Sequence, residues 1–382
     1  MVNLPARPRI KGIEPPGSLL KGNDMVERLQ MRIIKYFITI LLFCLFLLRG
    51  NIVSSSPNIK GEIALLIEGT TKTVLYEKNS EMTVTSNGPE TIITALLGLE
   101  RGYLQDRINT SNGDEFSLED LIYGALLEDD SNLNAAIAFH IGGSISRFAD
   151  MMKIKAKEIG ALSTYFPNTG EEPYTTASDL ALIAISALQS TQFSNIVKTS
   201  SWEWTSGGER RSFVNRNSLI GKYQGLDGVK VGEGYLIASA TRNGQQLLVV
   251  IINSKDAAGD ARLLLDYGFE NYQLYNFANH GDLLKTISVK DGVIKKVGLV
   301  AARDLNIVLP RNLHDASLEE IIEVREEIKA PIQRWEPLGQ YKVLLDQKEI
   351  GSVELLSDSQ VIRKSIAHTI REWFLLFINF FG

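Results

Sequence analysis

Acyl transfer by a serine needs a base close to its hydroxyl. A serine and a lysine three positions apart on a helix meet this need, because both side chains lie on one face. The chain carries this spacing at Ser18-Leu19-Leu20-Lys21. That sequence precedes an apolar segment and has no strand-and-helix context, so we interpret it as a chance match. No lysine occurs between Lys78 and Lys153, so the central part of the chain contains no such pair.

Histidine-based and metal-based chemistry has no clear basis in the sequence. The four histidines are scattered along the chain and show no spacing typical of metal ligands; they are His140, His280, His314 and His368. The one cysteine, Cys44, excludes an intrachain disulfide and a thiolate metal site. We therefore predict no metal site and no cofactor.

Each of three carboxylates has both a chemical and a structural interpretation. Asp129 and Asp130 could bind a cation or act as a carboxylate pair, but adjacent acids before a helix more often cap it and face solvent. Glu90 could be a general acid. The alternative is an acidic residue in an ordinary first helical turn after Pro89.

A series of short sequences resembles the low-molecular-mass penicillin-binding proteins, the serine D-alanyl-D-alanine carboxypeptidases that trim bacterial peptidoglycan. They follow the order of that family, at residues 75–79, 94–100, 156–160, 174–181, 215–219 and 226–232. The resemblance covers most of the chain. It implies an α+β fold with a penicillin-binding-protein or β-lactamase-like transpeptidase domain, in which an antiparallel sheet packs with a helical cluster, followed by a small all-β domain.

The resemblance also places the family's catalytic helix, and here the catalytic residues are replaced. Gly88 stands where the family has its serine, and Thr91 stands where it has its lysine. Glycine offers no nucleophile, and a threonine hydroxyl is no base near neutral pH. We therefore predict no catalytic residue and treat Gly88 and Thr91 as vestigial positions.

Two further motifs of the family are retained in part. Ser131 matches the serine of the Ser-x-Asn motif, whereas Leu133 replaces its asparagine, and Asn132 or Asn134 would substitute only after a shift of one residue. The family's Lys-Thr-Gly motif is Lys230-Val231-Gly232 here, which keeps the cation and loses the hydroxyl. The resemblance implies substrate-binding roles for Ser131, Lys230 and Gly232. The alternative for Lys230 is a strand lysine in solvent.

The elements that would position these residues follow from hydrophobic periodicity. Residues 63–68 and 73–76 indicate one hairpin, and residues 236–241 and 246–252, joined by Arg242-Asn243-Gly244, indicate another. Apolar spacing predicts helices at 91–101, 118–127, 134–141 and 145–159, with glycines at their ends. Segments at 284–289, 306–310, 341–345 and 351–355 predict a separate group of strands.

These patterns give five expected regions. They are a polar N-terminal extension at 1–30, a signal peptide or signal anchor at 31–56, a carboxypeptidase-like domain at 58–272, a small β-domain at 273–358, and an amphipathic membrane anchor at 359–382. A basic stretch before the apolar run predicts that the bulk of the chain lies outside the cytoplasm. The expected location is the extracytoplasmic face of a bacterial cytoplasmic membrane, in the periplasm.

The composition and net charge of the chain limit the kinds of partner that we expect. The formal net charge of −5 and the absence of a basic cluster interleaved with aromatics argue against nucleic acid. We expect peptidoglycan stem peptide or cell-wall proteins as partners, together with a membrane surface. The leading hypothesis is a non-catalytic binding or scaffolding protein in peptidoglycan metabolism. The alternatives are an active carboxypeptidase with a rearranged site and a purely structural envelope protein. The structural observation that would help most to separate these hypotheses is whether the space beside Gly88 is open to solvent or filled by a neighbouring side chain such as Glu90 or Tyr235.

Overall fold

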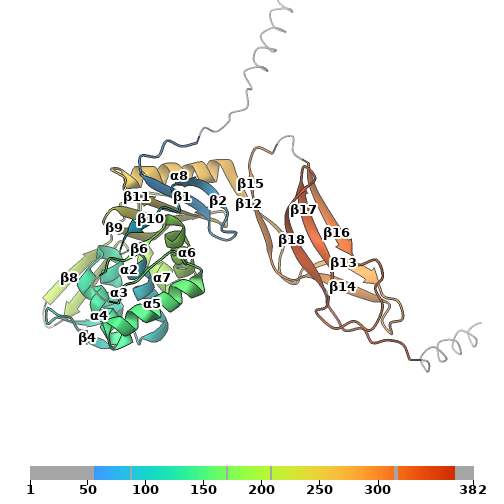
Figure 1. The fold of residues 1–382 in the computed structure, drawn as a ribbon, viewed down its shortest axis with the longest axis horizontal. Coiled ribbons are helices and arrows are strands. Elements are labelled where there is room, and N and C mark those ends of the chain that lie inside the picture. Colours follow the sequence, from blue (N-terminus) through green and yellow to red (C-terminus); the bar gives the residue numbers. More distant parts are fainter. Residues whose placement is uncertain (1–55, 87, 169–170, 207–208, 314–316, 366–382) are drawn as a thin grey trace, which may run out of the picture. The chain divides into compact units, whose positions relative to one another are not determined.

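A computed structural model describes residues 56–86, 88–168, 171–206, 209–313 and 317–365 (Figure 1). Residues 31–55 of the expected signal segment and 366–382 of the expected C-terminal anchor lie outside these residues. Within the described ranges, no single helix is long and apolar enough to cross a membrane. Helices α6 (Ala177–Leu188) and α7 (Thr191–Lys198) pass that test only as a pair, bent by 106°.

The first structural unit is built on a five-stranded antiparallel sheet. Its strand order is β2-β1-β11-β10-β9. The strands span Ile63–Glu68 (β1), Val74–Lys78 (β2), Leu226–Gly232 (β9), Tyr235–Arg242 (β10) and Gln245–Ile252 (β11). Both predicted hairpins are confirmed, since β1 pairs with β2 and β10 pairs with β11. The Asn243-Gly244 turn joins the second hairpin with a positive φ at both residues, as a tight hairpin requires.

Both faces of this sheet are covered. Along β11, Leu248 and Val250 belong to the core shared with the helical cluster, whereas Leu247 and Val249 belong to a second core that includes Leu264 of helix α8 (Ala257–Asn271). Successive side chains of a strand point to opposite faces. The unbroken apolar run of β11 therefore serves two layers, with α8 on one face and the other helices on the opposite face (Figure 1).

The helical cluster contains the predicted helices and two more, α6 and α7. The cluster spans α2 (Gly88–Arg101), α3 (Leu118–Glu128), α4 (Ser131–Gly142), α5 (Ile145–Ile159), α6 and α7. Gly143 and Gly160 end α4 and α5 in the left-handed conformation, as expected from sequence. Helix α4 begins earlier than predicted, because Asp130 caps it and accepts hydrogen bonds from the backbone of Asn132 and Leu133.

Short strands complete this unit. They form the pairs β3 (Val84–Thr85) with β6 (Tyr174–Thr175), β4 (Arg107–Asn109) with β5 (Glu115–Ser117), and β7 (Ser201–Ser206) with β8 (Glu209–Val214). The pair β3–β6 fixes the chain just before α2. It therefore holds the start of the helix that carries Gly88 and Thr91.

From Tyr272 onward the described residues form strands. A two-stranded sheet pairs β12 (Tyr272–Ala278) with β15 (Leu305–Pro310). A five-stranded sheet has the order β13-β14-β18-β17-β16, with strands at Leu283–Ser288, Lys296–Ala301, Lys348–Ser357, Pro337–Leu345 and Leu318–Val324. These strands enclose a hydrophobic core of their own around Leu299, Val343 and Leu355. The predicted α+β fold with a C-terminal all-β part is confirmed.

Candidate functional site

The aromatic ring of Tyr235 fills the space beside Gly88. A Cβ atom added to Gly88 would lie 3.0 Å from Cζ and 3.1 Å from Cε2 of Tyr235. Such distances are tighter than ordinary van der Waals contacts, so even a small side chain at position 88 requires movement of the ring. Tyr235 itself is 4% exposed. The space beside the residue predicted to stand at the nucleophile position is therefore filled by a buried aromatic side chain.

A tight turn between β9 and β10 brings Tyr235 to this place. Gly232 pairs directly with Tyr235 across the two strands, so Glu233 and Gly234 alone form the turn, and Gly234 has a φ of +75°. Residues paired across strands point to the same face, and a Cβ at Gly232 would overlap the ring of Tyr235. Gly232 therefore leaves the room into which the ring folds.

Thr91, predicted to stand at the position of the family's base, belongs to a buried polar network. The Nδ2 of Asn134 donates to the Thr91 hydroxyl at 2.9 Å, and that hydroxyl donates to Oδ1 of Asp129 at 3.4 Å. Thr91 is 1% exposed and Asn134 is 8% exposed. These bonds join α2, α4 and the residue after α3, so the network stabilises the packing of three helices.

Lys230 extends the same network and is fully buried. Its Nζ donates to the carbonyl oxygens of Ala125 at 2.9 Å and Leu126 at 3.1 Å, and lies 3.0 Å from Oδ1 of Asp129. The carbonyls at a helix C-terminus lack intrahelical donors and favour a cation. Burial lowers the pKa of Lys230 to about 8, against the opposing effect of Asp129. The alternative of a strand lysine in solvent is wrong.

Asp129 and Asp130 have different roles. Asp130 caps α4 and also lies 3.3 Å from Nη2 of Arg211, which confirms the capping interpretation. Asp129 is instead the C-cap residue of α3 in the left-handed conformation, with a φ of +64°. Its side chain faces Lys230 and is 16% exposed. The interpretation of Asp129 as solvated surface is therefore wrong, because a buried cation holds it.

Ser131 and Gly232 do not belong to this polar network. Ser131 starts α4, is exposed, and lines a pocket together with Glu90. Gly232 lies against Tyr235. Of the three residues expected to bind substrate, only Ser131 offers an exposed polar side chain. A ligand would reach the buried Lys230 amine only after the surrounding structure moved.

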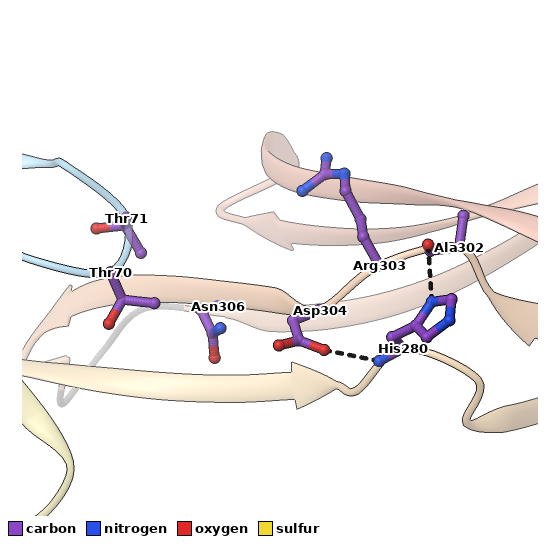
Figure 2. Close-up of a pocket in the computed structure, with 7 residues that line it drawn as sticks. All are labelled: Thr70, Thr71, His280, Ala302, Arg303, Asp304 and Asn306. Carbon is purple, nitrogen blue, oxygen red and sulfur yellow. Dashed lines mark hydrogen bonds between the residues drawn. The ribbon is translucent and has the colours of Figure 1, made fainter. Parts of the chain in front are cut away.

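A loop contact in the β-rich part involves His280. Figure 2 shows the backbone N–H of His280, which donates to Oδ1 of Asp304 at 2.7 Å, and the ring Nδ1, which lies 3.0 Å from the carbonyl oxygen of Ala302. Both contacts tie His280 to a neighbouring turn. Within the described residues no group of three or more histidine, cysteine, aspartate or glutamate side chains could hold a metal ion.

Comparisons with known proteins agree with this architecture. Residues 104–256 match the family model of the D-alanyl-D-alanine carboxypeptidases, and residues 272–363 match that of the penicillin-binding protein 5 C-terminal domain. The chain belongs to the D-alanyl-D-alanine carboxypeptidase family, peptidase S11. The match to the first model begins after α2, the helix that carries Gly88 and Thr91.

Individual relatives lie at low sequence identity. The carboxypeptidase DacF of Bacillus subtilis is 27% identical over 333 residues, which cover 79% of this chain and 84% of the relative. DacA of Haemophilus influenzae is 25% identical over 285 residues, covering 69% and 70%. Penicillin-binding protein 5 of H. influenzae superposes with a TM-score of 0.71 at 20% identity, covering 81% of this chain and 99% of that chain. The structural likeness shows a shared fold.

Proposed function

We propose that this chain is a non-catalytic carboxypeptidase homologue that acts in peptidoglycan metabolism as a binding or scaffolding protein. The observation that carries the proposal is the Tyr235 ring beside Gly88. A covalent acyl-enzyme needs a nucleophile and space for the acyl group, and this position offers neither. The family membership supports the cell-wall context, and the names of the relatives describe D-alanyl-D-alanine carboxypeptidases.

The proposed location is the bacterial cell envelope, on the extracytoplasmic side of the cytoplasmic membrane. The apolar run near the N-terminus and the amphipathic pattern at 359–382 support this part of the proposal. Expression in a bacterial host, followed by separation of soluble and membrane fractions with and without residues 366–382, tests the anchor and keeps Val361 in the β-rich core. Equal distribution of both forms would contradict it.

Labelling with a fluorescent penicillin tests the loss of acylation. We expect no covalent, heat-stable label on the purified chain. We also expect none on the double variant Gly88→Ser, Thr91→Lys, since Tyr235 still blocks the space next to position 88. A labelled family carboxypeptidase serves as the positive control. Label on the unmodified chain would favour the alternative of an active hydrolase with a rearranged site.

Titration with a peptidoglycan stem peptide separates binding from a purely structural role. We propose that Ser131 contributes to binding, because it is exposed and makes no hydrogen bond with its side chain to the described residues. Loss of one neutral hydrogen bond of about 1 kcal/mol predicts a roughly 5-fold weaker Kd for Ser131→Ala. Ser163→Ala, on another surface loop, is the control. Absence of binding in both proteins would favour the structural alternative.

A further inference from the structure

A partly enclosed pocket of about 360 Å³ lies on the α4 and α5 side of the start of α2. Most of its walls are apolar, from Phe148 and Met152 of α5, Phe166 of the following loop, and Ala135 of α4. Phe148 and Phe166 are each 1% exposed, so they form a fixed floor. The volume falls within the range of small-molecule sites.

Glu90 places a carboxylate in this apolar pocket. The structure shows no hydrogen bond or ion pair between the Glu90 side chain and any described residue. Burial, followed by the charge of Asp129, raises the pKa of Glu90. A carboxylate held in apolar surroundings without a partner is costly. A ligand that supplies a positive charge would remove this cost.

The acids near Glu90 have partners, which distinguishes them from Glu90. Asp129 faces Lys230 at 3.0 Å. Arg211 lies 3.0 Å from Glu128 and 3.3 Å from Asp130 through its Nη2. The other carboxylate of the pocket, Glu171, accepts a hydrogen bond from the Tyr165 hydroxyl. Among these acids, Glu90 is the one whose side chain has neither an ion pair nor a hydrogen bond to a described residue.

We propose that this pocket binds an organic ammonium group carried on an apolar stem, with the ammonium against Glu90 and the stem between Phe148, Met152 and Phe166. Aromatic walls favour such a ligand, because they contact the stem and attract cations through their faces. Ser131 at the rim supplies an additional hydrogen-bonding group. The inference does not depend on the proposed loss of acylation, since it requires no covalent step, although Ser131 also belongs to the proposed stem-peptide site.

Calorimetric titration of the full-length protein with 2-phenylethylamine tests the site, with 2-phenylethanol as the neutral probe of the same shape. We expect the amine to bind at least 5-fold more tightly than the alcohol. Glu90→Gln should abolish this preference while leaving the alcohol's affinity unchanged. Glu158→Gln, an exposed position on α5, removes the same charge outside the pocket and should keep the preference.

A second variant fills the pocket without touching the charge. Ala135 is an exposed residue of the lining, so Ala135→Leu should keep the fold and weaken the binding of both probes at least 5-fold.

A lysine-containing tripeptide and its Nε-acetylated form distinguish a peptide side chain from a free amine as the source of the ammonium group. Equal binding of amine and alcohol to the unmodified chain, no binding of either at millimolar concentration, or a preference that survives Glu90→Gln would overturn the proposal. These results leave the penicillin test unaffected.

Discussion

Replacing Lys230 by methionine is expected to lower the free energy of unfolding by about 3 kcal/mol, because one partner of a buried ion pair is removed and the other remains. Methionine keeps much of the length of the side chain, so the cavity stays small. It removes the amine that donates to the carbonyls of Ala125 and Leu126, of which Ala125 keeps the hydrogen bond from the backbone N–H of Asp129. Asp129 keeps some contact with water, which places the loss at the lower end of the range for buried pairs. Urea unfolding followed by fluorescence measures it.

A surface ion pair provides the control for this loss. Lys60 lies 3.5 Å from Asp256, and both side chains are more than half exposed. Lys60→Met should therefore change the free energy of unfolding by less than about 1 kcal/mol. A similarly small effect of Lys230→Met would show that the amine contributes little to the fold. In that case Lys230 would again be a candidate for binding an anionic ligand.

The stability of the unmodified chain should also depend on pH through Lys230. The pKa of this amine is about 8 in the folded chain and 10.5 ordinarily, so the unfolded chain binds more protons between those values. Stability contributed by this group therefore rises from pH 8 to pH 10.5. The difference in unfolding free energy between the unmodified chain and Lys230→Met should widen over this window. A constant difference across it would contradict the low pKa.

Local patterns were sufficient to predict much of the fold. The period-two apolar segments and the Asn243-Gly244 turn predicted the second hairpin, and helix α5 has the predicted bounds, because Ser144 caps one end and Gly160 the other. The hairpin β7–β8 and helix α8 were not predicted. Trp202 and Trp204, which alternate with polar residues in β7, were the available signal for the hairpin.

The sequence predicted which residues stand at the family's catalytic positions, but it did not predict the contacts around Lys230. Gly88 and Thr91 could be identified because the family's motif has fixed spacing. The pairing of Lys230 with Asp129 joins a strand to the end of a distant helix, and no local pattern reports such a contact. Sequence reasoning therefore assigned Lys230 to a ligand and Asp129 to solvent, whereas the fold uses each to neutralise the other.

The second large effect is expected for Tyr235, whose two substitutions separate its ring from its hydroxyl. Tyr235→Ala should lower the free energy of unfolding by about 3 to 5 kcal/mol, because it removes a buried aromatic ring and leaves a cavity beside Gly88. Tyr235→Phe keeps the ring. The hydroxyl is buried with no hydrogen-bond partner in the described part of the chain, so its removal should leave stability unchanged or raise it by up to about 1 kcal/mol.

Penicillin labelling then tests whether Tyr235 contributes to the proposed loss of acylation. In the double variant Gly88→Ser, Thr91→Lys, the further change Tyr235→Ala opens the space next to the new serine, so covalent label should appear in the triple variant and not in the double one. Tyr235→Phe in the same background keeps the ring and should give no label. Label already in the double variant would show that the ring moves aside freely, in which case the missing serine and lysine alone account for the absence of acylation. If Tyr235→Phe is less stable than the unmodified chain, the hydroxyl pairs with Asp129 instead. Burial raises the pKa of Tyr235 well above its usual value, and the charge of Asp129 raises it further.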